Sequence, residues 1–469
     1  MGRVNHGNYP PEIGKIISAN CSVEGCHNAQ SYKASGGLNL QSWSSLFAGA
    51  TNGSAVIPYS SRFSPLCYFI NSYPSLGPQS KPTMPLNRQP LPEPDVKKIM
   101  DWIDNGAPDV NGNIMWSDPG GRKAYVVNQG CDVVTVIDAA TLLPTRYIEV
   151  GTKAGAPDTP HHLRVSPDGK YWYVVFINNN VMQKYRCSDN SYMGAIPLTP
   201  FAAGTSNDPN DDAQDWNTFV ISADGKKAWC VSWTSNGKVA AVDLENMKLL
   251  HYLPGFSYPH GIAVNPANDK LYITAQTGNY VSALDTSFAT STVEISLQNG
   301  ITPSGFPSLN IHDIVFSPDG GRFLATCVGT NEVRVFDLGL NTVSAIVPTG
   351  TYPQEIVHSS FAHAYFVSCT MDTSHLAGSY GAVTRIREDD FSADIFACGY
   401  QPHGIAVDDR RGILYVASRN ILSAGPLPHH TNVCGGRNGF VNFINLGNFT
   451  LLDQRYELSA DPYFVFVRP

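Results

Sequence analysis

The chain has 469 residues, of which 42% are hydrophobic and only 15% charged, with a formal net charge of −8. This length allows two domains, or one large repeat architecture with a small module beside it. Lysine and arginine are scattered along an acidic chain, which argues against nucleic acid or an anionic membrane as a partner. Because no stretch of about 18 apolar residues is present, we expect no membrane span.

Ten cysteines are many for a reducing cytosol, so we expect an exported protein that is periplasmic or extracellular. Residues 1–4 run straight into polar sequence and show no signal peptide, which predicts a mature form with an added start Met. The 41 Gly, 33 Pro, 22 Tyr and 21 Phe residues favour turn-rich β-structure over helix bundles.

The first motif in chain order is NCSVEGCHN, which places Cys21, Cys26 and His27 in one short segment. Two cysteines directly followed by histidine are typical of a c-type haem site, although the usual spacing is two intervening residues and here it is four. The thiols would form thioethers with the haem vinyl groups, and the imidazole would ligate the iron. A zinc site would need further ligands nearby, and only Cys67 follows within 40 residues. A Cys21–Cys26 disulfide is the alternative.

Met84, between Thr83 and Pro85, is the candidate for a second axial ligand, and His/Met ligation raises the potential of a cytochrome. After it, apolar residues at helical spacing predict an amphipathic helix over 94–105, ended by Asn105-Gly106.

Residues 8–110 resemble class I c-type cytochrome modules, on Cys21, Cys26, His27, Met84 and the closing run DWIDNGAP (101–108). The resemblance implies a small all-α cytochrome c domain over residues 1–110. It also implies one covalent haem c, with its iron held by His27 and Met84.

From residue 115 onward the chain repeats itself seven times, at intervals of about 50 residues. Each unit is marked by a turn between two apolar runs, and the markers are SDPGGRKAYVV, SPDGKYWYVV, SADGKKAWCV, NPANDKLYIT, SPDGGRFLAT, SSFAHAYFVS and DDRRGILYVA. Four short strands at this period are typical of a β-propeller. The first unit lacks an inner strand, and DPYFVFVRP (461–469) matches the inner-strand segment 259–266.

We therefore predict an all-β, seven-bladed β-propeller over residues 115–469, closed by the C-terminal strand 461–469. This closure would leave no strand edge unpaired between the first blade and the last. The units resemble YVTN-type surface-layer and nitrite-reductase-like propellers, which specifies the fold well and the function poorly.

Aligning the units on their turns places one polar residue at the start of each inner strand: His161, Asn217, His260, His312, Gln354, His403 and Tyr463. Equivalent positions of a propeller converge on its central channel. Four imidazoles gathered there could hold copper, zinc or iron, or bind an anionic or planar ligand. The alternative is structural, with each histidine bonded to a neighbouring blade and to channel water.

This ring is similar to the nitrous oxide reductase propeller, whose inner-strand histidines hold a copper cluster. His161, His260, His312 and His403 match that pattern, with His162 as a further candidate. Asn217, Gln354 and Tyr463 depart from it, and no cupredoxin domain is present. The resemblance therefore implies a smaller site, with copper or another metal at the propeller axis.

Loops on one face of the propeller carry further functional candidates. Cys131, Cys327, Cys369 and Cys434 fall in loops between second and third strands, and Cys398 falls just before an inner strand. The insert 421–439 carries His429 and His430 and is expected to overhang the same mouth, pinned by a Cys398–Cys434 disulfide. His375 lies in a second insert. The acidic run 207–215 has the composition of a calcium loop, but a solvated loop is the preferred interpretation.

Three functions are compatible with these features. The first is an exported monohaem cytochrome that exchanges electrons with a redox partner protein, with the propeller as docking scaffold or ligand-binding site. The second is a redox enzyme with a metal or second cofactor at the histidine ring, supplied with electrons by the haem. The third is a cell-surface binding protein that uses haem for sensing. We favour the first and keep the second as the alternative.

The short linker, residues 109–114, predicts that the haem docks on the side or far face of the propeller, away from the ring. A homodimer would bring the haem of one subunit to the ring of the other.

Overall fold

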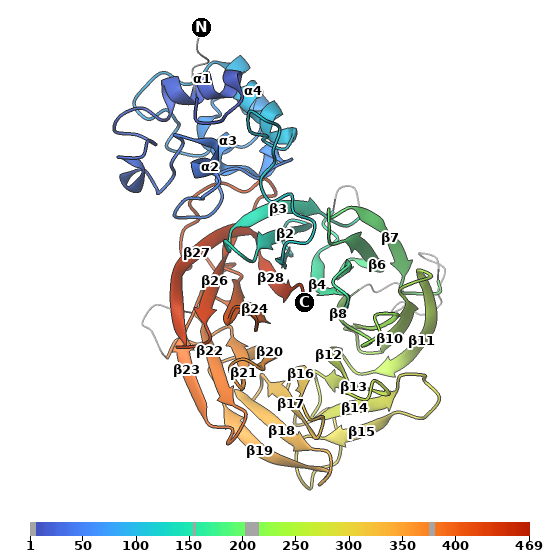
Figure 1. The fold of residues 1–469 in the computed structure, drawn as a ribbon. Helices are drawn as coiled ribbons and strands as arrows, with labels where there is room; N and C mark the ends of the chain where they lie inside the picture. The colour runs from blue at the N-terminus through green and yellow to red at the C-terminus, as the bar shows by residue number, and fades with distance from the viewer. Residues whose placement is uncertain (1–5, 153–155, 202–214, 375–379) are drawn as a thin grey trace.

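The computed structural model describes residues 6–152, 156–201, 215–374 and 380–469 (Figure 1). His375 and the acidic run, apart from Asp215, lie outside these ranges. Helices occupy the first part of the chain: α1 (Pro11–Asn20), η1 (Tyr32–Ala34), α2 (Trp43–Leu46), η2 (Ser61–Phe63), α3 (Pro65–Ile70), η3 (Pro74–Leu76) and α4 (Glu93–Asp104). We call residues 6–116 the N-terminal helical unit. None of the described helices is long and apolar enough to cross a membrane.

The N-terminal helical unit has its own apolar cluster and few regular elements. In α4 the buried residues are Val96, Ile99, Trp102 and Ile103, which lie on one face of the helix. Gly106 follows at a φ of 94°, a conformation that glycine adopts without strain and that ends the helix. The predicted helix is therefore confirmed, beginning one residue earlier than expected.

The remaining strands form seven antiparallel sheets of four strands, which confirms the seven-bladed propeller. Blade 1 comprises β28 (Pro462–Val467), β1 (Lys123–Asn128), β2 (Val133–Asp138) and β3 (Pro144–Glu149). Blades 2 to 4 comprise, from the axis outward, β4 (Pro160–Val165), β5 (Tyr171–Phe176), β6 (Asn179–Arg186), β7 (Tyr192–Pro197); β8 (Trp216–Ile221), β9 (Lys227–Ser232), β10 (Gly237–Asp243), β11 (Lys248–Phe256); and β12 (Pro259–Val264), β13 (Lys270–Ala275), β14 (Tyr280–Asp285), β15 (Val293–Ser296).

Blades 5 to 7 follow the same order and complete the circle seen in Figure 1. Their strands are β16 (Ile311–Phe316), β17 (Arg322–Cys327), β18 (Glu332–Asp337), β19 (Thr342–Pro348); β20 (Pro353–Ser359), β21 (Ala364–Cys369), β22 (Ala382–Arg387), β23 (Ala393–Ala397); and β24 (Pro402–Asp408), β25 (Ile413–Ser418), β26 (Asn438–Asn445), β27 (Thr450–Ala460). Apolar side chains from facing sheets form the core between neighbouring blades.

The C-terminal strand closes the ring as predicted. β28 pairs antiparallel with β1, with Ala124 opposite Val467 and Val127 opposite Phe464. Blade 1 is thus made from two distant parts of the chain, and blade 7 lies next to it in space. We call this junction of blades 7 and 1 the seam.

Each inner strand carries a register shift at its start, where the predicted ring residue lies. In β20, for example, Pro353 pairs with Cys369 and Ile356 with Val367, which leaves Gln354 and Glu355 without regular partners. A β-bulge of this kind redirects side chains and sharpens the local twist. Because every blade has it, the bulges turn a set of polar residues towards the axis.

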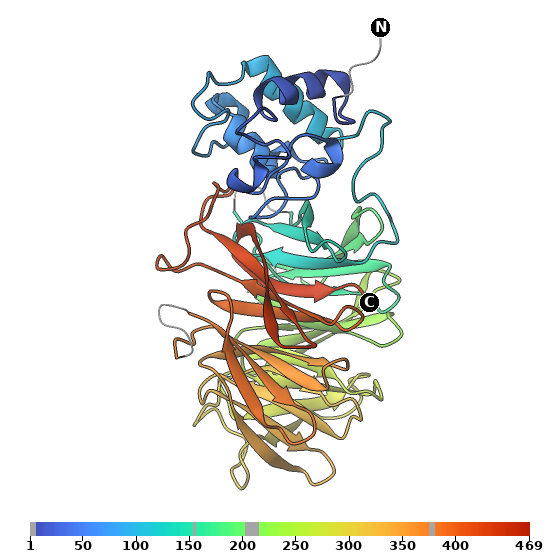
Figure 2. The ribbon, with the colours of Figure 1, turned by 60° about the vertical axis from the view of Figure 1, so that its left-hand side comes forward.

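The N-terminal helical unit packs on the rim of the propeller at the seam (Figures 1 and 2). On blade 1, Phe63 stacks on Tyr147 of β3 with ring centroids 5.0 Å apart. On blade 7, the Glu457 N–H of β27 donates to the Asn52 carbonyl at 3.2 Å. Both contacts involve outer strands, so the unit docks on the side of the propeller, one of the two positions predicted from the short linker.

Candidate functional sites

The haem-type motif forms a compact loop at the end of α1. The Cys21 N–H donates to the Ile17 carbonyl at 2.8 Å, and the His27 N–H donates back to the Cys21 carbonyl at 3.1 Å. Both Cys21 and Cys26 are free, so the alternative disulfide between them is not formed. Burial, and then the neighbouring Cys26, raise the pKa of the Cys21 thiol to about 12, so Cys21 is held as a neutral thiol.

His27 is oriented by a single backbone group. Its Nδ1 lies 3.0 Å from the Leu38 carbonyl, which can only accept a hydrogen bond. In the neutral ring Nδ1 therefore carries the proton, and Nε2 keeps its lone pair. Burial lowers the pKa of His27, while the Leu38 bond acts in the opposite sense. A histidine held by Nδ1–H in this way is the usual form of a metal ligand.

Met84 lies at the border of the same apolar cluster as Cys21. Its N–H donates to the Phe69 carbonyl at 2.8 Å, which fixes the segment to α3. Partly exposed apolar side chains surround the cluster: Leu38, Trp43, Tyr73, Leu76, Met84, Met100, Met115 and Trp116. A covalently attached haem requires two free thiols, an imidazole with an available nitrogen, a thioether and an apolar surrounding. Cys21, Cys26, His27, Met84 and the partly exposed apolar border are groups of these kinds.

Five of the seven predicted ring residues form a closed circle at the propeller axis. Their ring centroids are separated by 3.8 Å for His260–His312, 5.4 Å for His312–His403, 3.8 Å for His403–Tyr463, 4.3 Å for Tyr463–His161 and 6.1 Å for His161–His260. All five side chains are buried. Asn217 lies beside the circle and bonds the Pro259 carbonyl, whereas His162 packs between Phe219 and Phe464.

The structural alternative for the ring is correct for one nitrogen of three histidines. Nδ1 of His161 lies 2.8 Å from Nε2 of Gln129, which follows β1 of blade 1. Nδ1 of His260 lies 3.1 Å from the His312 carbonyl, and Nδ1 of His403 lies 3.1 Å from the Tyr463 carbonyl, so each of these two histidines bonds an inner strand of another blade. A glycine follows both His260 and His403, and a Cβ on Gly404 would lie 2.5 Å from the Phe464 Cα. The Pro-His-Gly sequence thus fits close strand packing as well as ligand binding.

Other ring nitrogens are left without partners. His161 Nε2, His312 Nδ1 and His403 Nε2 are buried and have no hydrogen bond. Burial lowers the pKa of all four ring histidines, to about 4 for His260, so the circle is uncharged at neutral pH. Buried polar atoms are normally satisfied, so these three nitrogens identify the circle as a candidate ligand site.

Two ionisable groups at the ring were not identified from the sequence. Arg419 lies 4.6 Å from the Tyr463 ring centroid and makes a bidentate ion pair with Asp461. Glu355, which follows the predicted ring residue Gln354, also faces the histidines, with Oε1 at 3.8 Å from His312 Nδ1 and 3.9 Å from His403 Nδ1. An acidic residue directly after a predicted ring position was the available signal for Glu355.

The insert after β25 differs from the prediction in two ways. Cys434 forms a disulfide with Cys131 across the seam, with Cα atoms 5.4 Å apart, and Cys398 is free and buried. The insert also turns outward to the N-terminal helical unit: the ring of His429 lies 5.2 Å from that of Phe69, and the ring of His430 5.7 Å from that of Tyr68. The predicted Cys398–Cys434 pair is therefore wrong. Cys67, Cys187 and Cys230 are likewise buried and unpaired.

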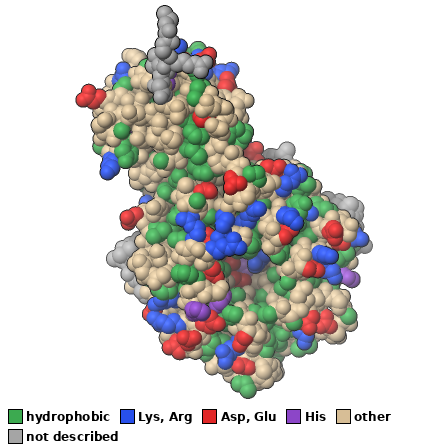
Figure 3. Space-filling view, viewed as in Figure 1, with side chains coloured by type: hydrophobic (Ala, Val, Ile, Leu, Met, Phe, Trp, Pro, Cys, Tyr) green, Lys and Arg blue, Asp and Glu red, His purple; other side chains and the backbone are tan. Residues whose placement is uncertain are grey.

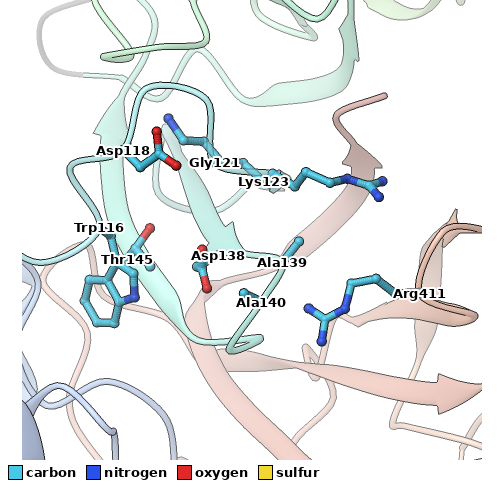
Figure 4. A pocket seen from close by; sticks show the side chains of 10 residues that line it. Trp116, Asp118, Gly121, Lys123, Asp138, Ala139, Ala140, Thr145 and Arg411 are labelled. Carbon is cyan, nitrogen blue, oxygen red and sulfur yellow. The ribbon is translucent and has the colours of Figure 1, made fainter.

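Two hollows lie at or near the N-terminal helical unit and away from the ring. One, of about 400 Å³, is at the seam and is lined by Trp116, Asp118, Lys123, Asp138 and Arg411 among others (Figure 4). The other, of about 750 Å³, lies beside α1 and has Tyr9, Ile17 and Leu40 in its wall. Figure 3 shows basic side chains gathered on the propeller face in view, below the helical unit. Neither hollow has Cys26, His27, Met84 or a ring histidine among its lining residues.

Comparison with solved structures shows the propeller fold. Kuenenia stuttgartiensis hydrazine synthase matches with a TM-score of 0.51 and 15% identity, over 68% of this chain and 92% of that one. A functionally unknown protein from Desulfotomaculum acetoxidans matches with a TM-score of 0.51 and 13% identity, over 72% and 99%. At these identities the likeness concerns the fold alone. No protein-family model matches the chain, and no curated protein matches its sequence.

Proposed function

We propose that this protein is an exported monohaem c-type cytochrome that transfers electrons, with the propeller as a docking scaffold. Cys21 and Cys26 would attach one haem c, and His27 and Met84 would be its axial ligands. When bound, the haem supplies a one-electron couple, and His/Met ligation gives it a raised potential. The likeness to a hydrazine synthase propeller is compatible with a scaffold for redox chemistry.

The observation that carries the proposal is the hydrogen bond between His27 Nδ1 and the Leu38 carbonyl. It fixes the tautomer whose Nε2 is free to ligate, at a histidine that directly follows two free thiols. The Leu38 carbonyl acts as the positioning group, because it sets the ring orientation and raises the basicity of the opposite nitrogen.

Export is part of the proposal. The disulfide between Cys131 and Cys434 is of a kind that persists in oxidising compartments, which supports a periplasmic or extracellular location. The redox partner would be another protein that docks near the N-terminal helical unit. Because that unit sits on the rim, a homodimer remains the arrangement that would bring a haem to the ring of a second subunit.

The test compares Met84→Leu with Met100→Leu in protein produced with haem-attachment enzymes. Both methionines border the same apolar cluster, and only Met84 is proposed to bind iron. A pyridine haemochrome assay should give one covalent haem per chain in the unaltered protein and in both variants. The Met84 variant should lose the sulfur-to-iron charge-transfer band and show a lower potential, and the Met100 variant should retain both. Absence of covalent haem in the unaltered protein would overturn the proposal.

A further inference from the structure

An acidic residue lies beside His312 and His403 in the ring. The two histidines belong to blades 5 and 7, and the bulge at the start of β20 in blade 6 brings Glu355 between them. One ligand atom from each of the three residues lies within 4.8 Å of the other two. The side chains are all buried, with exposed fractions of 2% for His312, 8% for Glu355 and 1% for His403.

The nitrogens of this group are suited to accept a positive ion. His312 Nδ1 has no hydrogen-bond partner, and Nδ1–H of His403 is committed to the Tyr463 carbonyl, which leaves an unpartnered Nε2. A buried polar atom without a partner costs free energy, and a cation bound at such a nitrogen would relieve that cost. The carbonyl behind His403 is the kind of outer contact that metal-bound histidines have.

The carboxyl group of Glu355 also interacts with two other charged residues, Asp313 and Arg164. It is hydrogen-bonded to Asp313, and Arg164 lies close to both acids. These contacts hold the carboxyl group in place beside the two histidines.

From this geometry we infer that His312, His403 and Glu355 form a binding site for a divalent transition-metal ion of the zinc class. Two imidazoles and one carboxylate are a recurrent ligand set for Zn²⁺, and they leave a coordination position open. Ligands of a tetrahedral zinc ion are about 3.4 Å apart. The 3.8 Å between His312 Nδ1 and Glu355 Oε1 therefore requires a shift of only a few tenths of an ångström.

The site is distinct from the proposed haem and differs from an all-histidine copper ring. His161 belongs to the same circle and also has an unpartnered nitrogen, Nε2, but it stands outside the group of three. This difference provides a matched control. His161→Gln should keep the ion, whereas Glu355→Gln and His403→Gln should lose it.

The experiment is equilibrium dialysis of the full-length, haem-loaded protein against micromolar Zn²⁺ after treatment with a chelator, with zinc and iron counted by mass spectrometry. The unaltered protein should bind one zinc per chain. Glu355→Gln should bind at least about 100-fold more weakly, whereas His161→Gln should bind like the unaltered protein. Circular dichroism should show that each variant is folded, and zinc should raise the unfolding temperature only where it binds.

A second measurement does not depend on variants. Anomalous diffraction at the zinc edge, from crystals of the unaltered protein, should give one peak between β16, β20 and β24. No stoichiometric zinc, or zinc that survives in Glu355→Gln, would overturn the inference. So would copper binding that depends equally on His161 and His260, because it would assign the site to the histidines alone. The iron count tests the haem separately, so failure of one proposal does not affect the other.

Discussion

The two candidate sites of this protein are built in opposite ways. In the N-terminal helical unit, Cys21, Cys26 and His27 come from one loop, which its own backbone hydrogen bonds close. In the propeller, each ring residue comes from a different blade, and bulges at equivalent positions bring them together. A local site depends on a few covalently adjacent residues, whereas a distributed site depends on closure of the whole ring. The two should therefore fail independently.

The largest expected effect is in the N-terminal helical unit. Cys21→Ala with Cys26→Ala should abolish covalent haem attachment completely, because these two thiols are the proposed attachment points in the loop that ends at His27. The β-sheet circular dichroism of the propeller should be unchanged. Cys67→Ala is the matched control, since Cys67 is fully buried in the same apolar cluster but is not proposed to carry haem. Haem that stays covalently bound in the double variant would disprove the attachment site.

In the propeller, low pH should reduce the free energy of unfolding through buried histidines. Burial, and then Arg164, hold the pKa of His162 well below its ordinary value, so the folded state stays neutral where the unfolded chain takes up a proton. The free energy of unfolding should therefore fall as the pH drops below about 6.5, by at most about 1.4 kcal/mol per pH unit for each such histidine. Glu355, with a raised pKa, acts in the opposite direction.

His162→Phe isolates this effect, because the side chain packs on Phe219 and Phe464 and its Nδ1 has no hydrogen bond. Denaturant unfolding at pH 7 and pH 5 should show a smaller acid loss in the variant than in the unaltered protein. Equal losses would mean that His162 is already protonated in the folded state.

Loss of the disulfide should also lower the stability of the propeller. Cys131→Ser with Cys434→Ser removes a link between residues 303 positions apart and should lower the free energy of unfolding by about 2–4 kcal/mol. A thiol reductant should bring the unaltered protein down to the stability of the double variant and leave the variant unchanged. A reductant effect of equal size on both proteins would place the sensitive cysteines elsewhere.

The smallest effect is expected from an ion pair between the two parts of the molecule. Arg62 bonds Glu149 of β3, but both side chains are more than half exposed, so Arg62→Gln should cost under about 1 kcal/mol. The adjacent Phe63 is 7% exposed and stacks on Tyr147, and Phe63→Ala should cost about 3 kcal/mol. Thermal unfolding of the two variants side by side tests this ranking.

Much of the propeller could be predicted because each blade repeats a local turn signal. The repeated Ser-Pro-Asp-Gly-like turns identify the blades, and the match between 461–469 and an inner strand identifies the closure. What could not be predicted depends on geometry between blades. Glu355 follows Gln354 in the bulge of β20 and approaches histidines of two other blades, a contact that alignment of single blades does not show.

The disulfide shows the same limit. Cys398 and Cys434 are closer in sequence than Cys131 and Cys434, but ring closure brings blade 1 against blade 7 and sets Cys131 beside the insert. The motif around Cys21 needed no such information, because spacing along the chain alone places the thiols and His27 in one loop.

The seam is fastened at several points. Four features cross it: the C-terminal strand β28 paired with β1, the Cys131–Cys434 disulfide, the ion pair of Arg122 with Asp408 at 2.8 Å, and the N-terminal helical unit packed on β3 and β27. Because these features stabilise one junction of the ring, local opening of the strands should occur more often on the opposite side. In a hydrogen-exchange experiment, the amides of blades 3 to 5 should therefore be the first of the ring to exchange, and those of blades 7 and 1 the last.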